Sequence, residues 1–334
     1  MTVTTTTQPT PAEQVVVEAQ QHQASQAALT AATVAAILAV WAQMDAHDWY
    51  GSWWTRGLGE RVYVLLSMAQ ESVASEAHGF VSTSLDLIGA PGEIPTIVPH
   101  AFAGIASDGR DLETLLAGAP IRALQKTRQG APPAVASASG RAWLQMVIET
   151  QIPDAGRAAD QVAIATAIPV QRTRRRQKSR YGWVRMLNPP SCARCVVLAG
   201  KFYRWNEGFL RHPACDCRHI PAIEAIDDDL TTNPYAYFKS LSPEDQDAWF
   251  GNANAEAIRN GADIGQVINA TGRGGVFTAD GGKHYTTEGT TGRGFYGRNS
   301  DGVLRPTPWQ IFRDAHGSSD EVRRQLLKFG YILS

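Results

Sequence analysis

The chain has only four cysteines, and it lacks any apolar stretch long enough to span a membrane. Its longest apolar run covers residues 31–42 and is interrupted by Thr33, whereas a spanning helix needs roughly 20 apolar residues. We also find no secretory signal at its start. The sequence therefore predicts a protein without a transmembrane segment and without a membrane partner.

Net charge is nearly absent as well, with 31 Lys plus Arg against 32 Asp plus Glu. Such a balance provides no global attraction to nucleic acid or to a membrane surface, so any affinity of that kind has to be local. At 334 residues and 43% hydrophobic composition, the chain can bury a substantial core. Its length favours about two domains.

Large apolar side chains are rare near the N-terminus, which reads MTVTTTTQPTPAEQ. A segment of this composition cannot offset the entropy lost on ordering, so we predict a flexible tail over residues 1–29. Residues 30–168 are predicted to form a helical domain, because apolar side chains recur there at helical spacing. The recurring positions are Val34, Ile37, Leu38, Trp41 and Met44, then Val62, Leu65, Leu66 and Val73.

A basic run follows the helical domain. Such a run repels itself unless something anionic neutralises it. We predict that residues 169–180 form a basic connector, and its cations are our candidates for contact with nucleic acid; a plain exposed linker is the alternative. The cations are Arg172, Arg174, Arg175, Arg176, Lys178 and Arg180.

All four cysteines lie in one short segment that also holds two histidines. Thiolates and imidazoles at this spacing can surround one tetrahedral Zn²⁺, although the same cysteines could form two disulfides. Zinc is favoured because thiols stay reduced in a cytosol. A closed site takes four ligands, so at least two of the six candidates are spectators. The pattern is Cys192-x2-Cys195 followed by His212-x2-Cys215-x-Cys217-x-His219.

The neighbours of these ligands predict short strands. Residues 181–187 are aromatic and β-branched, and residues 196–203 favour a hairpin with Gly200 in its turn. The first cysteine pair would then lie in a knuckle between strands. We predict a mainly α protein with a small α+β Cys/His, zinc-knuckle-like module over residues 181–225.

The remaining residues, 226–334, are predicted to form a helical and glycine-rich region. The run Ser242-Pro243-Glu244-Asp245 indicates a helix start, with a hydroxyl cap, Pro at the first helical position and an acidic first turn. Glycine recurs so often between Gly272 and Gly297 that a compact core is not expected there.

Residues 181–222 resemble the Cys-x2-Cys…His-Pro-x-Cys-x-Cys…Pro signature of the MuF-like phage head-morphogenesis family, the minor capsid proteins of tailed phages. Two later segments, SPEDQDAWFGNANAEAIRNGADIGQVINA and TTEGTTGRGF, resemble the versions found in phages of actinobacteria. His219 lies outside the core signature. The positions that match it are Cys192, Cys195, Gly200, His212, Pro213, Cys215 and Cys217.

This resemblance implies a low-copy virion protein that acts near the portal in procapsid assembly, and in DNA packaging or ejection. It implies the portal, and the major capsid or scaffold protein, as partners, with phage DNA as a further partner through the basic run. The implied location is the capsid interior, after assembly in the host cytoplasm.

Two enzymatic alternatives compete with this structural role. Some related phage proteins are described as capsid maturation proteases, but His78, His100 and Ser139 do not lie in a nucleophile elbow. The run Arg218-His219-Ile220-Pro221 weakly resembles the end of a zinc-dependent nuclease site, yet its aspartate is missing. We therefore predict assembly rather than catalysis.

Overall fold

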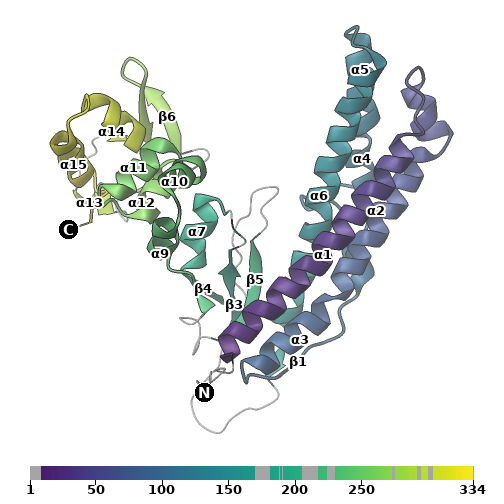
Figure 1. Cartoon of the computed structure of the whole chain (residues 1–334), viewed down its shortest axis with the longest axis horizontal. Coiled ribbons are helices and arrows are strands. Elements are labelled where there is room, and N and C mark those ends of the chain that lie inside the picture. The colour runs from purple at the N-terminus through teal and green to yellow at the C-terminus, as the bar shows by residue number, and fades with distance from the viewer. Residues whose placement is uncertain are drawn as a thin grey trace, which may run out of the picture. The chain divides into compact units, whose positions relative to one another are not determined.

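The computed structural model describes residues 9–169, 181–187, 189, 191–204, 217–223, 230–272, 275–291, 295–299 and 304–333. The chain forms two compact units, coloured along the sequence in Figure 1. Unit 1 comprises Met1–Met186 and Phe202–Leu230, and unit 2 comprises Leu187–Lys201 and Thr231–Ser334. The chain therefore passes from one unit to the other three times.

Unit 1 is built on long helices that pack side by side, with α1, α2 and α6 in mutual contact (Figure 1). The first helix begins with a capping box, in which Thr10 Oγ1 accepts from the Glu13 amide and Glu13 Oε2 accepts from the Thr10 amide. The helices are α1 (Pro11–Trp41), η1 (Gly51–Thr55), α2 (Leu58–Ser75), α3 (Ala77–Leu87), η2 (Pro99–Phe102), α4 (Leu112–Leu116), α5 (Gly118–Arg128) and α6 (Pro133–Thr166).

The start of α1 contradicts one prediction. A flexible tail over residues 1–29 is wrong for residues 11–29, which are helical, while residues 1–8 lie outside the described part of the chain. The error has a physical cause, because the face that α1 buries here is short of large apolar side chains. It consists of Val15, Ala19, His22, Gln26 and Thr30.

By length and composition, α1 is also the one described helix that could cross a membrane, with a mean hydropathy of 1.6 over an 18-residue window. A mostly buried core helix of a soluble protein and a signal sequence pass the same test, and 33% of this window is buried within the structure. Because α1 packs along α2, α3 and α6, its apolar character is weak evidence for a membrane span.

Two small antiparallel sheets complete unit 1. Strand β1 (Gly92–Glu93) pairs with β2 (Ile168–Pro169), and β3 (Tyr181–Met186) lies between β4 (Phe202–Arg204) and β5 (Arg218–Ile223). The strand predicted at residues 181–187 is confirmed. All of β3 is buried, and Trp183, Val184 and Ile220 belong to the same apolar core as Val15 and Phe80 of the helices. The sheet is therefore part of the helical unit.

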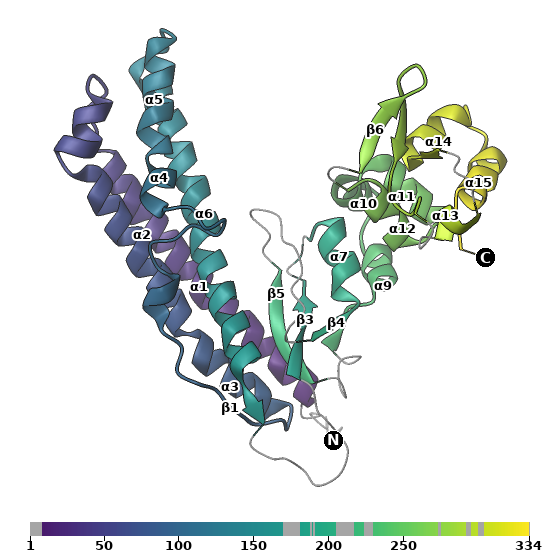
Figure 2. The ribbon, with the colours of Figure 1, turned by 180° about the vertical axis from the view of Figure 1, so that it is seen from behind.

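Unit 2 consists of short helices around a second core, with a three-stranded antiparallel sheet of order β6-β7-β8 (Figure 2). The predicted cap at Ser242 is confirmed, since its hydroxyl accepts from the Asp245 amide. The elements are α7 (Ala193–Ala199), α9 (Pro234–Ser240), α10 (Pro243–Phe250), α11 (Asn252–Arg259), α12 (Ile264–Ala270), β6 (Val276–Ala279), β7 (Lys283–Thr286), α13 (Phe295–Asn299), β8 (Arg305–Pro306), α14 (Pro308–Asp314) and α15 (Ser319–Lys328).

A buried arginine, Arg305, links several segments of unit 2 through hydrogen bonds. Arg305 is 1% exposed and donates through Nε to the Phe329 carbonyl (3.0 Å) and through Nη1 to the Glu288 carbonyl (2.8 Å). Its Nη2 donates to Gln266 Oε1 (3.1 Å), and its Cζ lies 4.1 Å from the centroid of the Tyr331 ring. Desolvation lowers the pKa of Arg305. The carbonyl dipoles and the ring face replace the water that the guanidinium loses.

The mainly helical fold with small antiparallel sheets agrees with the sequence-based prediction, but the hairpin predicted at residues 196–203 is wrong. Residues 193–199 form α7 and not the first arm of a hairpin. The prediction failed because a short apolar run is compatible with either a helix or a strand. The residues of the predicted module are divided between the two units. Residues 187–201 belong to unit 2, whereas residues 202–223 belong to unit 1.

Candidate functional site

The first pair of predicted zinc ligands lies at the start of α7. Cys192 is the residue before the first helical turn and Cys195 lies within that turn, so the helix brings their Sγ atoms to 3.4 Å. This separation is too long for a disulfide, whose sulfurs are about 2.05 Å apart. Two sulfurs at about 2.3 Å from one tetrahedral Zn²⁺ lie about 3.8 Å apart. The pair therefore has nearly the geometry of half a zinc site.

Cys217 and His219 lie in unit 1, at the start of β5. Cys217 is 1% exposed, and its Sγ accepts a hydrogen bond of 2.9 Å from Arg185 Nη1 on β3. His219 Nδ1 lies 3.3 Å from Gln161 Nε2, and the His219 ring lies 5.2 Å from the Trp183 ring. Both residues thus have protein contacts in the core of unit 1, as expected of buried polar groups.

The side chains of Arg185, Cys217 and His219 share one face of the β3–β5 pair. Arg185 lies opposite His219 in the register, and Cys217 precedes His219 by two positions, so alternation along the strand places all three on the same side. Tyr203 on β4 adjoins the group. Burial raises the pKa of Tyr203, whereas the charge of Arg185 acts in the opposite direction.

The remaining predicted site residues lie outside the described part of the chain. They are His212, Cys215 and the six cations Arg172, Arg174, Arg175, Arg176, Lys178 and Arg180. Within the described ranges, no three His, Cys, Asp or Glu side chains are gathered so that they could hold a metal ion. The Cys192–Cys195 pair is what the structure contributes to the zinc hypothesis, and the four-ligand site stays a prediction.

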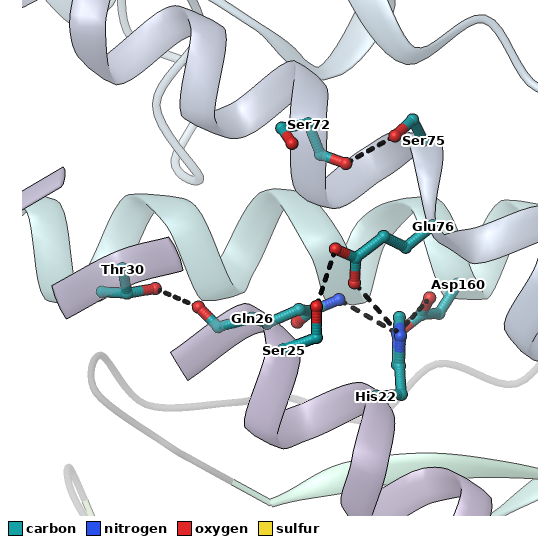
Figure 3. Close-up of polar contacts among 8 residues, drawn as sticks. All are labelled: His22, Ser25, Gln26, Thr30, Ser72, Ser75, Glu76 and Asp160. Carbon is teal, nitrogen blue, oxygen red and sulfur yellow. Dashed lines mark hydrogen bonds and ion pairs between the residues drawn. The ribbon is translucent and has the colours of Figure 1, made fainter. Parts of the chain in front are cut away.

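Unit 1 contains a buried polar cluster that the sequence did not predict (Figure 3). His22 on α1 lies between two carboxylates. Its Nε2 is 3.1 Å from Asp160 Oδ1 on α6, and its Nδ1 is 3.5 Å from Glu76 Oε2, between α2 and α3. Gln26 Nε2 lies 3.0 Å from His22 Nε2, and Ser25 Oγ donates to Glu76 Oε1 over 3.1 Å. The cluster therefore links α1 to α6 and to the junction between α2 and α3 through one imidazole.

The geometry of this cluster suits a structural role. The His22 ring stacks on Phe80, with centroids 4.2 Å apart and planes at 8°, and the His22 and Asp160 side chains are only 5% and 4% exposed. A substrate would have little access to either group. The one available signal in the sequence was the polar face formed by His22, Gln26 and Thr30 at helical spacing, inside a helix with apolar residues on both sides.

The residues considered for a protease come from three different helices. His78 is an exposed residue of α3, His100 is in η2 with its side chain 83% exposed, and Ser139 is in α6. His100 Nδ1 lies 3.5 Å from Glu71 Oε2. In the described structure neither histidine is hydrogen-bonded to Ser139, so these three residues do not form a nucleophile–base pair.

No protein-family model matches the chain, and no curated protein or solved structure matches it either.

Proposed function

We propose that this chain is a structural assembly protein of the MuF-like kind, a minor capsid protein that acts near the portal during procapsid assembly of a tailed phage. The observation that carries the proposal is the Cys192–Cys195 pair. It supplies the first half of the signature at residues 181–222, and its 3.4 Å Sγ–Sγ distance suits two ligands of one metal ion.

In this proposal, Zn²⁺ is held by Cys192, Cys195 and two ligands from the group His212, Cys215, Cys217 and His219. Bound zinc contributes its binding free energy to folding and requires no catalysis. His219 is the weakest candidate, because it is outside the core signature and already contacts Gln161 and Trp183.

The proposed partners follow from the resemblance and from local charge. The portal, and the major capsid or scaffold protein, are the protein partners, and the basic run at residues 172–180 is the contact for phage DNA. The protein would act in the host cytoplasm during assembly and reside in the capsid interior afterwards. The separation of His78, His100 and Ser139 supports assembly over proteolysis.

The test is co-expression of the full chain with the portal and major capsid proteins encoded beside it, followed by sedimentation of the particles. We expect the chain to sediment with procapsids. Recovery of the chain only in the soluble fraction, while particles form normally, would contradict the proposal. The full chain is required because a fragment ending at residue 168 lacks β3 and β5, which cover part of the core of unit 1.

A further inference from the structure

Unit 1 carries a groove with a mixed apolar and acidic lining, which nothing in the described structure fills. It lies between α2 on one side and α4 and α5 on the other, and it has a volume of about 660 Å³. Its apolar lining comes from both sides and from the π-helix η1. The residues that supply this lining are Trp53, Trp54, Tyr63, Val64, Leu116 and Ile121.

Trp53, which lines the groove, packs against another buried aromatic ring. Trp53 is buried and lies edge-on to Trp41, with ring centroids 6.3 Å apart. Gly59 is required beside it, because a Cβ at this position would lie 2.5 Å from Trp53 Nε1. The backbone of η1 directs Trp53 inward and leaves the adjacent Trp54 at the surface. The groove is thus preformed, which lowers the entropic cost of binding.

Large apolar side chains remain exposed along the groove. Trp54, Val64 and Ile121 are each 45% exposed and line the same groove, and exposed apolar residues that are grouped in this way mark interaction sites. The apolar surface continues beyond the groove. Tyr50 stacks on Trp54 with centroids 4.7 Å apart, and Met68 follows Val64 by one turn of α2. Covering this surface would remove apolar area from water.

The polar rim of the groove carries charge of one sign. Three carboxylates line it, from Glu60 on α2, Asp111 before α4 and Glu113 on α4. Among the described residues that line the groove, none is a Lys, Arg or His. An occupant with positive charges beside its apolar anchors would complement both features.

We propose that this groove binds an amphipathic helix of a partner protein, with apolar side chains against Trp54, Val64 and Ile121 and with Lys or Arg beside the rim carboxylates. A helix fits because Glu60, Val64 and Met68 are four residues apart, so they form a row about 12 Å long on one face of α2. A helix laid along this row can place residues from successive turns into the groove. This inference does not depend on the phage assignment.

The test measures binding of two labelled helical peptides to the full chain by fluorescence anisotropy. Both peptides carry the same Leu stripe, and their polar face is Lys in one and Glu in the other. We expect the Lys peptide to bind more tightly. Val64→Arg or Ile121→Ser should weaken it about tenfold, in line with the loss of one anchoring contact. Val162→Arg, at an exposed apolar position of α6, is the matched control.

Three outcomes would overturn the proposal. The Glu peptide could bind as well as the Lys peptide, or Val162→Arg could weaken binding as much as the groove variants do. Sedimentation could instead reveal a dimer that Val64→Arg dissociates, in which case a second copy of the chain covers the groove. Circular dichroism of each variant confirms its folding, and having groove variants on both α2 and α5 keeps the test decisive if one of them unfolds.

Discussion

His22 Nε2 on α1 lies 3.1 Å from Asp160 Oδ1 on α6, although the two residues are 138 positions apart in the chain. The pair fixes how the N-terminal half of α1 lies against α6, in a region where the buried face of α1 has few large apolar side chains. In this half of α1 a polar contact determines how the helix packs, whereas apolar side chains do so further along the helix.

Replacing His22 with Ala should lower the free energy of unfolding by about 2 kcal/mol, because it leaves the buried Asp160 side chain without its hydrogen-bond partner. Urea unfolding followed by circular dichroism measures the change. The control is His78→Ala, at an exposed position of α3, which should change stability by less than about 0.5 kcal/mol. Equal effects of the two substitutions would contradict a stabilising role for the cluster.

A double-mutant cycle isolates the pair itself. Asp160→Asn replaces one of the two carboxyl oxygens that contact His22 Nε2, so adding His22→Ala to it should cost about 1 kcal/mol less than His22→Ala costs in the unmodified chain. Strict additivity of the two substitutions would indicate that each acts through separate contacts.

Tyr331 predicts how unit 2 responds to alkaline pH. Its hydroxyl donates to the Pro306 carbonyl over 2.9 Å, and burial raises its pKa above the ordinary value of about 10. The unfolded chain therefore loses this proton first. The contribution of Tyr331 to stability is complete below about pH 10 and decreases as the pH rises toward the raised pKa of the folded state.

Unfolding free energies measured between neutral pH and about pH 11 test this expectation. Tyr331→Phe should flatten the alkaline decline, although it should cost about 1 kcal/mol at neutral pH through the lost hydrogen bond. Tyr50→Phe, at a 63% exposed position, should leave the decline unchanged. The prediction fails if the two variants have the same pH dependence.

The zinc hypothesis predicts about one zinc per chain purified without chelator, measured by mass spectrometry. Cys192→Ser and Cys195→Ser should each abolish it, because both thiols belong to the close pair. His219→Ala should retain the metal. Thiol titration before and after denaturation completes the test, since a chain with neither metal nor titratable thiols would contain two disulfides.

The basic run predicts DNA binding that depends strongly on salt. Replacing Arg174, Arg175 and Arg176 with Ala should weaken binding to all sequences alike and reduce the slope of log K against log salt by about 2 to 3. The matched control removes three exposed cations of α15, Arg323, Arg324 and Lys328. A slope that both triple variants reduce equally would exclude a dedicated contact.

Apolar periodicity and capping chemistry were sufficient to predict much of this fold. Val62 and Leu66 are both buried on α2, and the hydroxyl of Ser242 caps α10 as its sequence indicates. Both features are local, so the surrounding structure reinforces what neighbouring residues already favour.

The errors arise where long-range contacts decide the outcome. His22 stabilises a helix through Asp160, which no local pattern reveals, and α7 is too short for its periodicity to identify it. The groove at Trp54 was also missed, because its two sides come from elements that are distant in sequence. For the candidate metal site, spacing predicted that Cys192 and Cys195 lie close together, but not that a helix holds them.

The three passages of the chain between its units constrain the order in which the protein can fold during synthesis. Residues 187–201, which belong to unit 2, emerge from the ribosome before β4 and β5 of unit 1 do. Unit 1 therefore stays incomplete until Ile223 has emerged, and unit 2 must retain its early segment until α9 to α15 arrive. A single proteolytic cut cannot separate such interleaved units, so neither can be obtained as an uninterrupted fragment.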